Sequence, residues 1–184
     1  MKKKKKATGA IGYVMLFTIA IIMVTITLYM LASAKLMTIQ HDVDDALADA
    51  VLASLVADDV YYFETWESTG TAVVRFKDVN ESYLAFRDSM KEAIESESDF
   101  YKDIKYPMFI CYEVNGENVT IKIFNELGGM SESKGKLGEV KTPTGTVVKE
   151  TSAYGKVSFT LTSLLGGKPI DKSRDLYCTI KNNN

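Results

Sequence analysis

The one histidine of the chain, His41, lies beside carboxylates at Asp42, Asp44 and Asp45. Imidazole and carboxylate groups are both metal ligands. Only residues three or four positions apart share a face of a helix, so His41 and Asp45 form the one suitable pair. Two ligands make a weak site, and we expect neither a metal nor a cofactor.

Patterns typical of catalysis or nucleotide binding are missing from the sequence. Gly128-Gly129 and Gly166-Gly167 lack the spacing of a phosphate-binding loop and the lysine and hydroxyl residue that follow it. A Ser/His/Asp triad would have to use His41, and no nucleophile-elbow pattern surrounds any serine. We therefore expect no enzyme activity and no catalytic residues.

Cys111 and Cys178 are the two cysteines of the chain, and an oxidising compartment would favour a disulfide between them. A hairpin at Asn115-Gly116 would turn Cys111 away from the apolar face of that hairpin. Cys178 alternates with Leu176 and Ile180, which indicates a position facing the core. Both a disulfide and two free thiols stay open.

An apolar segment follows a run of lysines at the N-terminus. Residues 7–34 contain no charged side chain, and most of residues 11–31 are large and apolar. Roughly 20 such residues at about 1.5 Å each cross a hydrocarbon core of about 30 Å. The lysines that we expect to hold the N-terminus in the cytoplasm are Lys2, Lys3, Lys4, Lys5 and Lys6.

The expected organisation is a basic cytoplasmic head (1–9), a transmembrane helix (10–36) and an extracytoplasmic domain (37–184). The lysine run then needs no nucleic-acid partner, because it marks topology and contacts anionic lipid headgroups. An alternative is a cleaved signal peptide, since Ala32-Ser33-Ala34 resembles a cleavage site. The apolar run is longer than the roughly 7 to 15 residues of a signal peptide, which favours a retained anchor.

One long helix is expected over residues 12–62, with an amphipathic second half. Val43, Leu47, Val51 and Leu55 form its apolar stripe. Two helices with a break near residues 35–42 are the alternative. Aromatic residues at the end of this helix are expected to pack in the core rather than to form an exposed partner-binding patch; they are Tyr61, Tyr62, Phe63 and Trp66.

The rest of the chain predicts an α+β domain with a small antiparallel sheet. We expect a strand at 71–79, and a second helix at 80–97 that is N-capped by Asn80. The buried stripe of this second helix should be Tyr83, Leu84, Met90 and Ile94. A hairpin should join strands 107–114 and 117–124, and strands should follow at 146–150, 156–161 and 176–181. Residues 128–145 should be an exposed, mobile connection, and the tail at 182–184 should fray.

The order of a basic head, a spanning helix with an amphipathic extension and an α+β domain resembles a pilin or pseudopilin. Residues 5–14, KKATGAIGYV, resemble the start of TadE-like pseudopilins of the tight-adherence (Tad) pilus system. The resemblance covers roughly the first 60 residues and makes Gly9 and Ala10 a candidate processing site. In that family a glutamate stands where this chain has Gly12, and no acidic residue precedes Asp42. The departure indicates a minor component, or an unprocessed relative that stays in the membrane, rather than a polymerising major subunit.

Two functions follow as expectations. The first is a membrane-anchored structural component of a pilus or secretion-type assembly in a bacterial envelope. Its partners would be the lipid bilayer and other membrane subunits, which the N-terminal helix contacts with help from the small residues Ala46, Ala50 and Ala53. Packing of these alanines on the chain's own sheet is the alternative. The second function is a membrane-tethered extracellular module that binds a ligand on its sheet face or at residues 128–145.

Overall fold

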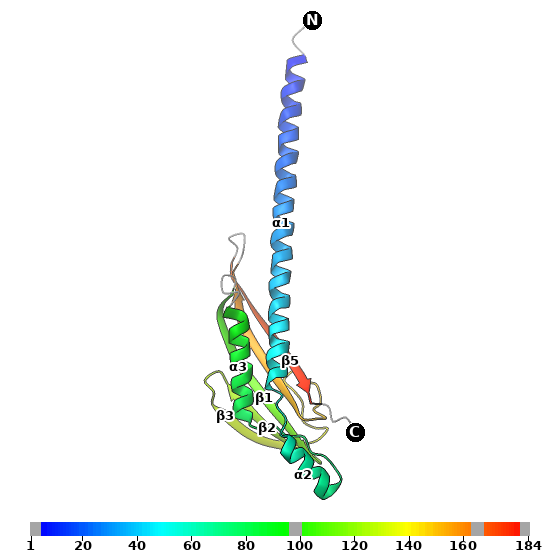
Figure 1. Ribbon diagram of the computed structural model, residues 1–184. Helices are drawn as coiled ribbons and strands as arrows, with labels where there is room; N and C mark the ends of the chain where they lie inside the picture. Colours follow the sequence, from blue (N-terminus) through cyan, green and yellow to red (C-terminus); the bar gives the residue numbers. More distant parts are fainter. Residues whose placement is uncertain (1–4, 96–100, 163–167, 181–184) are drawn as a thin grey trace. The chain divides into compact units, whose positions relative to one another are not determined.

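The protein is described by a computed structural model that covers residues 5–95, 101–162 and 168–180. The chain divides into two compact units between His41 and Asp42, compared with the boundary after residue 36 that the sequence predicts. Its class is α+β, as expected, with a long N-terminal helix, two further helices and one antiparallel sheet of five strands (Figure 1). The predicted tail at 182–184 lies outside the described residues.

Helix α1 runs from Lys5 to Ser54, so the predicted alternative of a break near residues 35–42 is not found. Within the second unit, three residues of the predicted stripe are confirmed, because Val43, Leu47 and Val51 are buried. Leu55, the fourth, lies beyond the end of the helix and is half-buried. The predicted end at residue 62 is wrong. Ser54 Oγ donates a hydrogen bond to the carbonyl of Val51 at 2.6 Å, and the helix ends there.

The helix ends early because the next residues pair with a distant segment. The amide of Asp58 donates to the carbonyl of Arg75, and the amide of Lys77 donates to the carbonyl of Val56, each at 3.0 Å. These bonds compete with the helical pattern for the same backbone groups. A separate helix α2 (Asp59–Thr69) then starts at an N-cap formed by Asp58.

Residues 71–79 do not form the predicted strand. Their one ladder contact is the isolated bridge between Phe76 and Ala57. Side chains hold this extended segment instead: Thr151 Oγ1 donates to the carbonyl of Val74 at 2.6 Å, and the amide of Phe76 donates to Glu113 Oε1 at 3.1 Å. The β-branched residues of this segment therefore adopt an extended backbone, but the segment is not a strand of the sheet.

Helix α3 (Val79–Glu95) matches the expected second helix with two differences. Asp78 rather than Asn80 caps it, since Asp78 Oδ1 accepts a hydrogen bond from the Asn80 amide at 2.7 Å. Leu84 is 43% exposed, and Phe86 is fully buried in its place. The observed buried stripe is Tyr83, Phe86, Met90 and Ile94.

The sheet has the order β3-β2-β1-β4-β5. Its strands are β1 (Tyr101–Asn115), β2 (Asn118–Asn125), β3 (Met130–Lys136), β4 (Ser152–Leu161) and β5 (Ile170–Thr179). The predicted hairpin is confirmed, because Asn115 pairs with Asn118 across the turn. The predicted strand 156–161 is part of β4, whereas the predicted strand 176–181 overlaps β5 only up to Thr179. The predicted mobile connection at 128–145 is wrong, because it contains β3.

Residues 146–150 are not a strand, although one was predicted there. An isolated bridge joins Val147 to Lys141, and Val148 is fully buried. Val148 packs with Val140 against one face of the sheet, next to Ile110 and Tyr154. This segment therefore covers the sheet rather than extending it.

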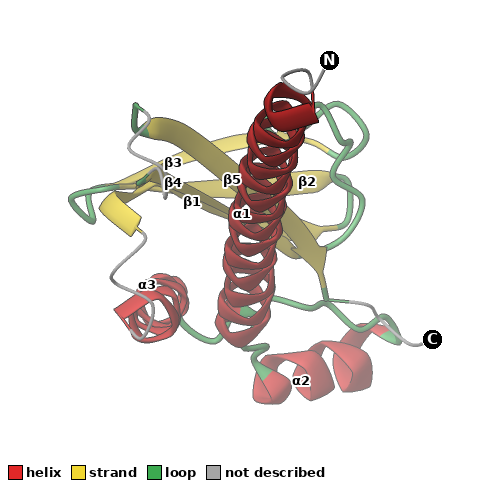
Figure 2. Cartoon of the chain, turned by 90° about the horizontal axis from the view of Figure 1, so that it is seen from above, coloured by secondary structure: helices red, strands yellow, loops and turns green. Residues whose placement is uncertain are grey.

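The other face of the sheet packs against α3 and the part of α1 that belongs to the second unit (Figure 2). Phe86 of α3 stacks on Phe109 of β1, with ring centroids 4.8 Å apart. Val51 of α1 reaches the same place, because a Cβ added at Gly155 of β4 would lie 2.8 Å from its Cγ2 atom. A glycine is needed at this position because two helices meet the sheet there.

Candidate membrane anchor and interaction surfaces

In the described part of the chain, α1 is long and apolar enough to cross a membrane. All side chains from Ile11 to Leu31 are exposed. Exposed apolar surface of this extent is unfavourable in water and favourable in lipid. The segment therefore has the properties of a single membrane-spanning helix.

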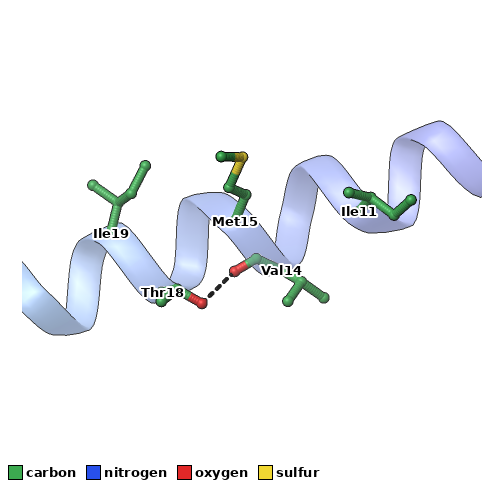
Figure 3. Close-up of a pocket in the computed structure, with 5 residues that line it drawn as sticks. All are labelled: Ile11, Val14, Met15, Thr18 and Ile19. Atoms are coloured by element: carbon green, nitrogen blue, oxygen red, sulfur yellow. Dashed lines mark hydrogen bonds between the residues drawn. The ribbon is translucent and has the colours of Figure 1, made fainter.

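The threonine hydroxyls of this segment are satisfied by the helix itself. Thr18 Oγ1 donates to the carbonyl of Val14 at 2.8 Å, beside a shallow apolar hollow that Ile11, Met15 and Ile19 also line (Figure 3). Thr25 and Thr27 donate in the same way to the carbonyls of Ile21 and Met23. Such bonds remove the need for water around a hydroxyl group, as a lipid environment requires.

Two tyrosines stand near the ends of the apolar segment. Tyr13 is 81% exposed and Tyr29 is 66% exposed. They are separated by 16 residues, or about 24 Å at the helical rise. Tyrosine is enriched at the two interfaces of a membrane, so this spacing suits a ring at each interface. The spacing of these two tyrosines is visible in the sequence and adds to the signal of the apolar run.

Several predicted site residues lie at the start of the chain. Lys2, Lys3 and Lys4 are outside the described residues, whereas Lys5, Lys6, Gly9 and Ala10 belong to α1. Cytoplasmic placement of the lysines and processing at Gly9 and Ala10 stay predictions.

Cys111 and Cys178 are free thiols. In the register of the sheet, Cys111 pairs with Ala153 of β4, and Ala153 pairs with Cys178 of β5. Directly paired residues share a face, so the opposite orientations that the sequence indicates are wrong. The thiols still lie two strands apart, roughly 9.5 Å, because neighbouring strands are about 4.8 Å apart. A disulfide needs a Cα separation below about 7 Å, so this pair does not meet its geometry.

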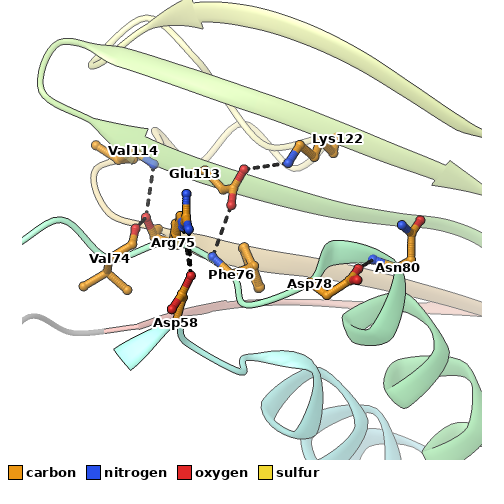
Figure 4. Close-up of polar contacts among 10 residues, drawn as sticks. Asp58, Val74, Arg75, Phe76, Asp78, Asn80, Glu113, Val114 and Lys122 are labelled. Atoms are coloured by element: carbon orange, nitrogen blue, oxygen red, sulfur yellow. Dashed lines mark hydrogen bonds and ion pairs between the residues drawn. The ribbon is translucent and has the colours of Figure 1, made fainter. Parts of the chain in front are cut away.

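A cleft of about 360 Å³ lies between the extended segment 75–79 and strands β1 and β2. Lys122 Nζ and Glu113 Oε2 form an ion pair at 2.8 Å in its lining, and Glu113 Oε1 accepts from the Phe76 amide (Figure 4). Arg75 and Lys77 line the cleft from the extended segment. Both carboxylate oxygens of Glu113 are therefore engaged, and the same ion pair balances the charge of Lys122.

Arg75 joins this cleft to α2. Its guanidinium is 2.8 Å from Asp58 Oδ2 and lies 3.7 Å from the centroid of the Tyr61 ring. The pKa of the Asp58 carboxyl is lowered, first by the hydrogen bond from the Tyr61 amide and then by the hydrogen bond from Arg75. Asp58 thus caps α2 and orients Arg75 at the same time.

The aromatic residues of α2 are not core residues, contrary to the prediction. No residue of this helix is buried, and Phe63 and Trp66 are 62% and 49% exposed. Tyr61 contacts Arg75, while Tyr62 contacts Phe63 edge to face with ring centroids 5.5 Å apart. The exposed-patch alternative therefore describes this helix better.

The small residues proposed for partner contacts are divided between core and surface. Ala50 is fully buried within the second unit, Ala46 is half-buried and Ala53 is exposed. Packing on the chain's own domain therefore accounts for Ala50. Ala53 stays accessible for the predicted partner contacts, and Ala46 does so in part.

No group of three or more His, Cys, Asp or Glu side chains that could hold a metal ion occurs among the described residues, and His41 and Asp45 are both exposed. Searches of protein-family models, curated proteins and solved structures find no match to this chain.

Proposed function

We propose that this chain is a single-pass membrane protein that serves as a minor, pilin-like structural subunit of a pilus or secretion-type assembly in a bacterial envelope. The N-terminal lysines stay in the cytoplasm, the first half of α1 lies in the bilayer and residues 42–184 form the extracytoplasmic domain. The outer domain docks in the assembly.

The division of α1 into two kinds of surface carries this proposal. Every side chain between Ile11 and Leu31 is exposed, whereas Val43, Leu47 and Val51 are buried in the core of the second unit. In pilin-type subunits, one half of the N-terminal helix lies in the membrane and the other half packs on a sheet domain. The N-terminal residues of this chain also resemble those of pilin-type subunits. Gly12 at the position of the family's glutamate favours a minor subunit.

The start of the mature protein is the first test, by mass spectrometry of material from the membrane fraction. An intact N-terminus supports the anchored helix, and a start at Ala10 supports pilin-type processing as well. A start at Lys35 would show that the helix is a signal peptide and would exclude both the topology and the pilin-like role.

The anchor itself is tested by Val24→Asp, which places a charge at the middle of the apolar segment. Such a charge costs about 2.5 to 3.5 kcal/mol on insertion, so carbonate extraction should release the variant from membranes. Leu52→Asp is the matched control, because Leu52 is an exposed residue of the same helix in the outer domain. Assembly is then measured by blue-native electrophoresis of gently solubilised membranes. A chain that always migrates without other envelope proteins would refute the structural role.

A further inference from the structure

A cavity of about 330 Å³ opens where the first part of β1 meets the end of β4 and the start of β5. Ligand pockets measure roughly 300 to 1,000 Å³, so this one suits a small group. Its polar lining consists of two lysines, two aspartates and two hydroxyl residues: Lys105, Lys172, Asp103, Asp171, Ser158 and Thr160.

The backbone of β1 is irregular at this cavity. Its register with β4 shifts between Lys102 and Lys105, and again between Lys105 and Met108. Asp103, inside the first irregularity, has φ 53° and is the one non-glycine residue with a positive φ in the described part of the chain. Bulges redirect side chains, and a left-handed aspartate persists where the surrounding structure enforces it. The irregular part of β1 therefore brings Asp103 to the cavity.

The charged groups of the cavity have both signs. Within the described ranges, no ion pair joins Lys105 or Lys172 to a carboxylate. Asp171 Oδ1 accepts a hydrogen bond from Thr160 Oγ1 at 2.7 Å, which is a neutral donor and leaves the charge of the carboxylate unbalanced. Two cations and two anions make the cavity neutral overall, so the complementary ligand carries both charges.

Two contacts show to which end of the second unit the cavity belongs. Arg174 Nε lies 2.9 Å from Asp44 Oδ1, close to the point where α1 enters this unit. Further along α1, Val51 reaches the glycine of β4 that pairs with Leu176. β5 and the outer part of α1 therefore run in the same direction. The start of β5, and the cavity with it, lies at the end of the unit where the chain enters.

We propose that this cavity holds the headgroup of a zwitterionic phospholipid, phosphatidylethanolamine, from the adjoining surface of the bilayer. This site rests on the proposed function, because residues 35–41 alone connect the uncharged membrane segment to the second unit. Lys105 and Lys172 bind the phosphate, while Asp103 and Asp171 accept hydrogen bonds from the ammonium group. Charge-assisted hydrogen bonds of this kind distinguish it from phosphatidylcholine, which has no N–H donor, and from phosphatidylglycerol, which has no cation.

Lipid selection by the full-length chain tests the site. The protein is placed in nanodiscs with equal amounts of phosphatidylethanolamine, phosphatidylcholine and phosphatidylglycerol, and native mass spectrometry identifies the lipids that remain bound after release. Phosphatidylethanolamine should be retained about fivefold over each of the other two, since one exposed ion pair contributes up to about this factor. Equal retention of the three lipids would overturn the proposal.

Two double variants separate the two halves of the headgroup. Asp103→Asn with Asp171→Asn keeps an acceptor for Thr160, and asparagine tolerates the left-handed backbone at position 103. This variant should retain phosphatidylethanolamine only as well as phosphatidylcholine. Lys105→Gln with Lys172→Gln should lower retention of phosphatidylethanolamine by at least about fivefold. Unchanged selection in either variant would overturn the proposal.

A matched control is Lys134→Gln with Lys149→Gln, because both lysines are exposed and lie outside the cavity. This control should select lipids as the wild type does, and the same loss as in the Lys105 and Lys172 variant would overturn the proposal. Lipid held by the membrane helix alone is distinguished, because none of these changes touches that segment.

Amine labelling gives a second measurement on the unchanged protein. Lys105 and Lys172 should react about fivefold more slowly in nanodiscs of phosphatidylethanolamine than in detergent micelles, whereas Lys134 should react equally in both. Equal rates for all three lysines would overturn the proposal. Failure of the membrane anchor gives a different result, because such a chain would not enter nanodiscs at all.

Discussion

Replacing Gly155 with alanine should destabilise the outer domain, because the new methyl group has no space. An ideal Cβ at this position lies 2.6 Å from Phe86 Cε2 and 2.8 Å from Val51 Cγ2. Neither neighbour can withdraw easily, since both are fully buried and Phe86 is stacked on Phe109. The contact joins β4, α1 and α3, so any adjustment moves a helix relative to the sheet.

The expected size of the effect is a balance of two terms. Overpacking of a dense core costs about 1 to 3 kcal/mol. Replacing glycine with alanine also restricts the unfolded chain, which raises the free energy of unfolding by about 0.4 to 1 kcal/mol where the backbone tolerates alanine. The difference between these two terms is a net loss of about 0 to 2.6 kcal/mol in the free energy of unfolding, with a midpoint of about 1.3 kcal/mol. Urea unfolding of the full chain in micelles, followed by near-ultraviolet circular dichroism, measures it.

Phe86→Leu in the same background provides the control. The smaller side chain gives space to the new methyl group, so the two changes together should cost less than the sum of the single changes, by at least about 0.5 kcal/mol. A stabilising effect of Gly155→Ala would refute the packing argument. Additive costs in the double variant would refute the assignment of the clash to Phe86.

In the folded protein, Cys178 should react with iodoacetamide before Cys111, because burial raises the pKa of both thiols and Cys111 is fully buried; equal labelling rates in peptide mapping would contradict this. The pKa of Asp58 is lowered in the folded state, so its contribution to stability is present above the pKa of the unfolded chain and is lost as the pH falls through the folded value. Trp66 fluorescence should report a loosening of α2 below about pH 4, and Asp58→Asn, which keeps a cap but cannot titrate, should lose this transition. Thr151→Val should lower the free energy of unfolding by about 1 to 3 kcal/mol in thermal unfolding, because one buried hydroxyl serves two backbone groups, and an unchanged midpoint would show that water replaces it.

Elements with a strong local period could be predicted from the sequence. The alternation around Asn115-Gly116 gives the hairpin, because a two-residue turn fixes the register of its strands. The stripe of Val43, Leu47 and Val51 gives the packed part of α1. The stripe of α3 contains a missed signal: Tyr83, Phe86 and Met90 repeat at three and four residues, which identifies Phe86 rather than Leu84.

Elements that depend on distant partners could not be predicted in this way. β3 is almost entirely polar and exposed, and it is a strand because β2 offers a free edge to it. Residues 71–79 have strand-forming composition, but their backbone groups bind Thr151 and Glu113 side chains. In both cases the partner lies far away in the sequence, and local composition does not contain that information.

The aromatic residues of α2 show why hydrophobicity alone does not decide burial. The sequence predicts Tyr61, Phe63 and Trp66 to be core residues at the end of one continuous helix. The helix instead ends, because Asp58 can satisfy the first amides of a new helix and bind Arg75 at the same time. That turn at Asp58 directs Phe63 and Trp66 to the surface. An N-cap residue that also forms a long-range ion pair therefore places residues of core-like composition at a candidate interface. Of these causes, only the capping preference of Asp58 can be recognised in the sequence.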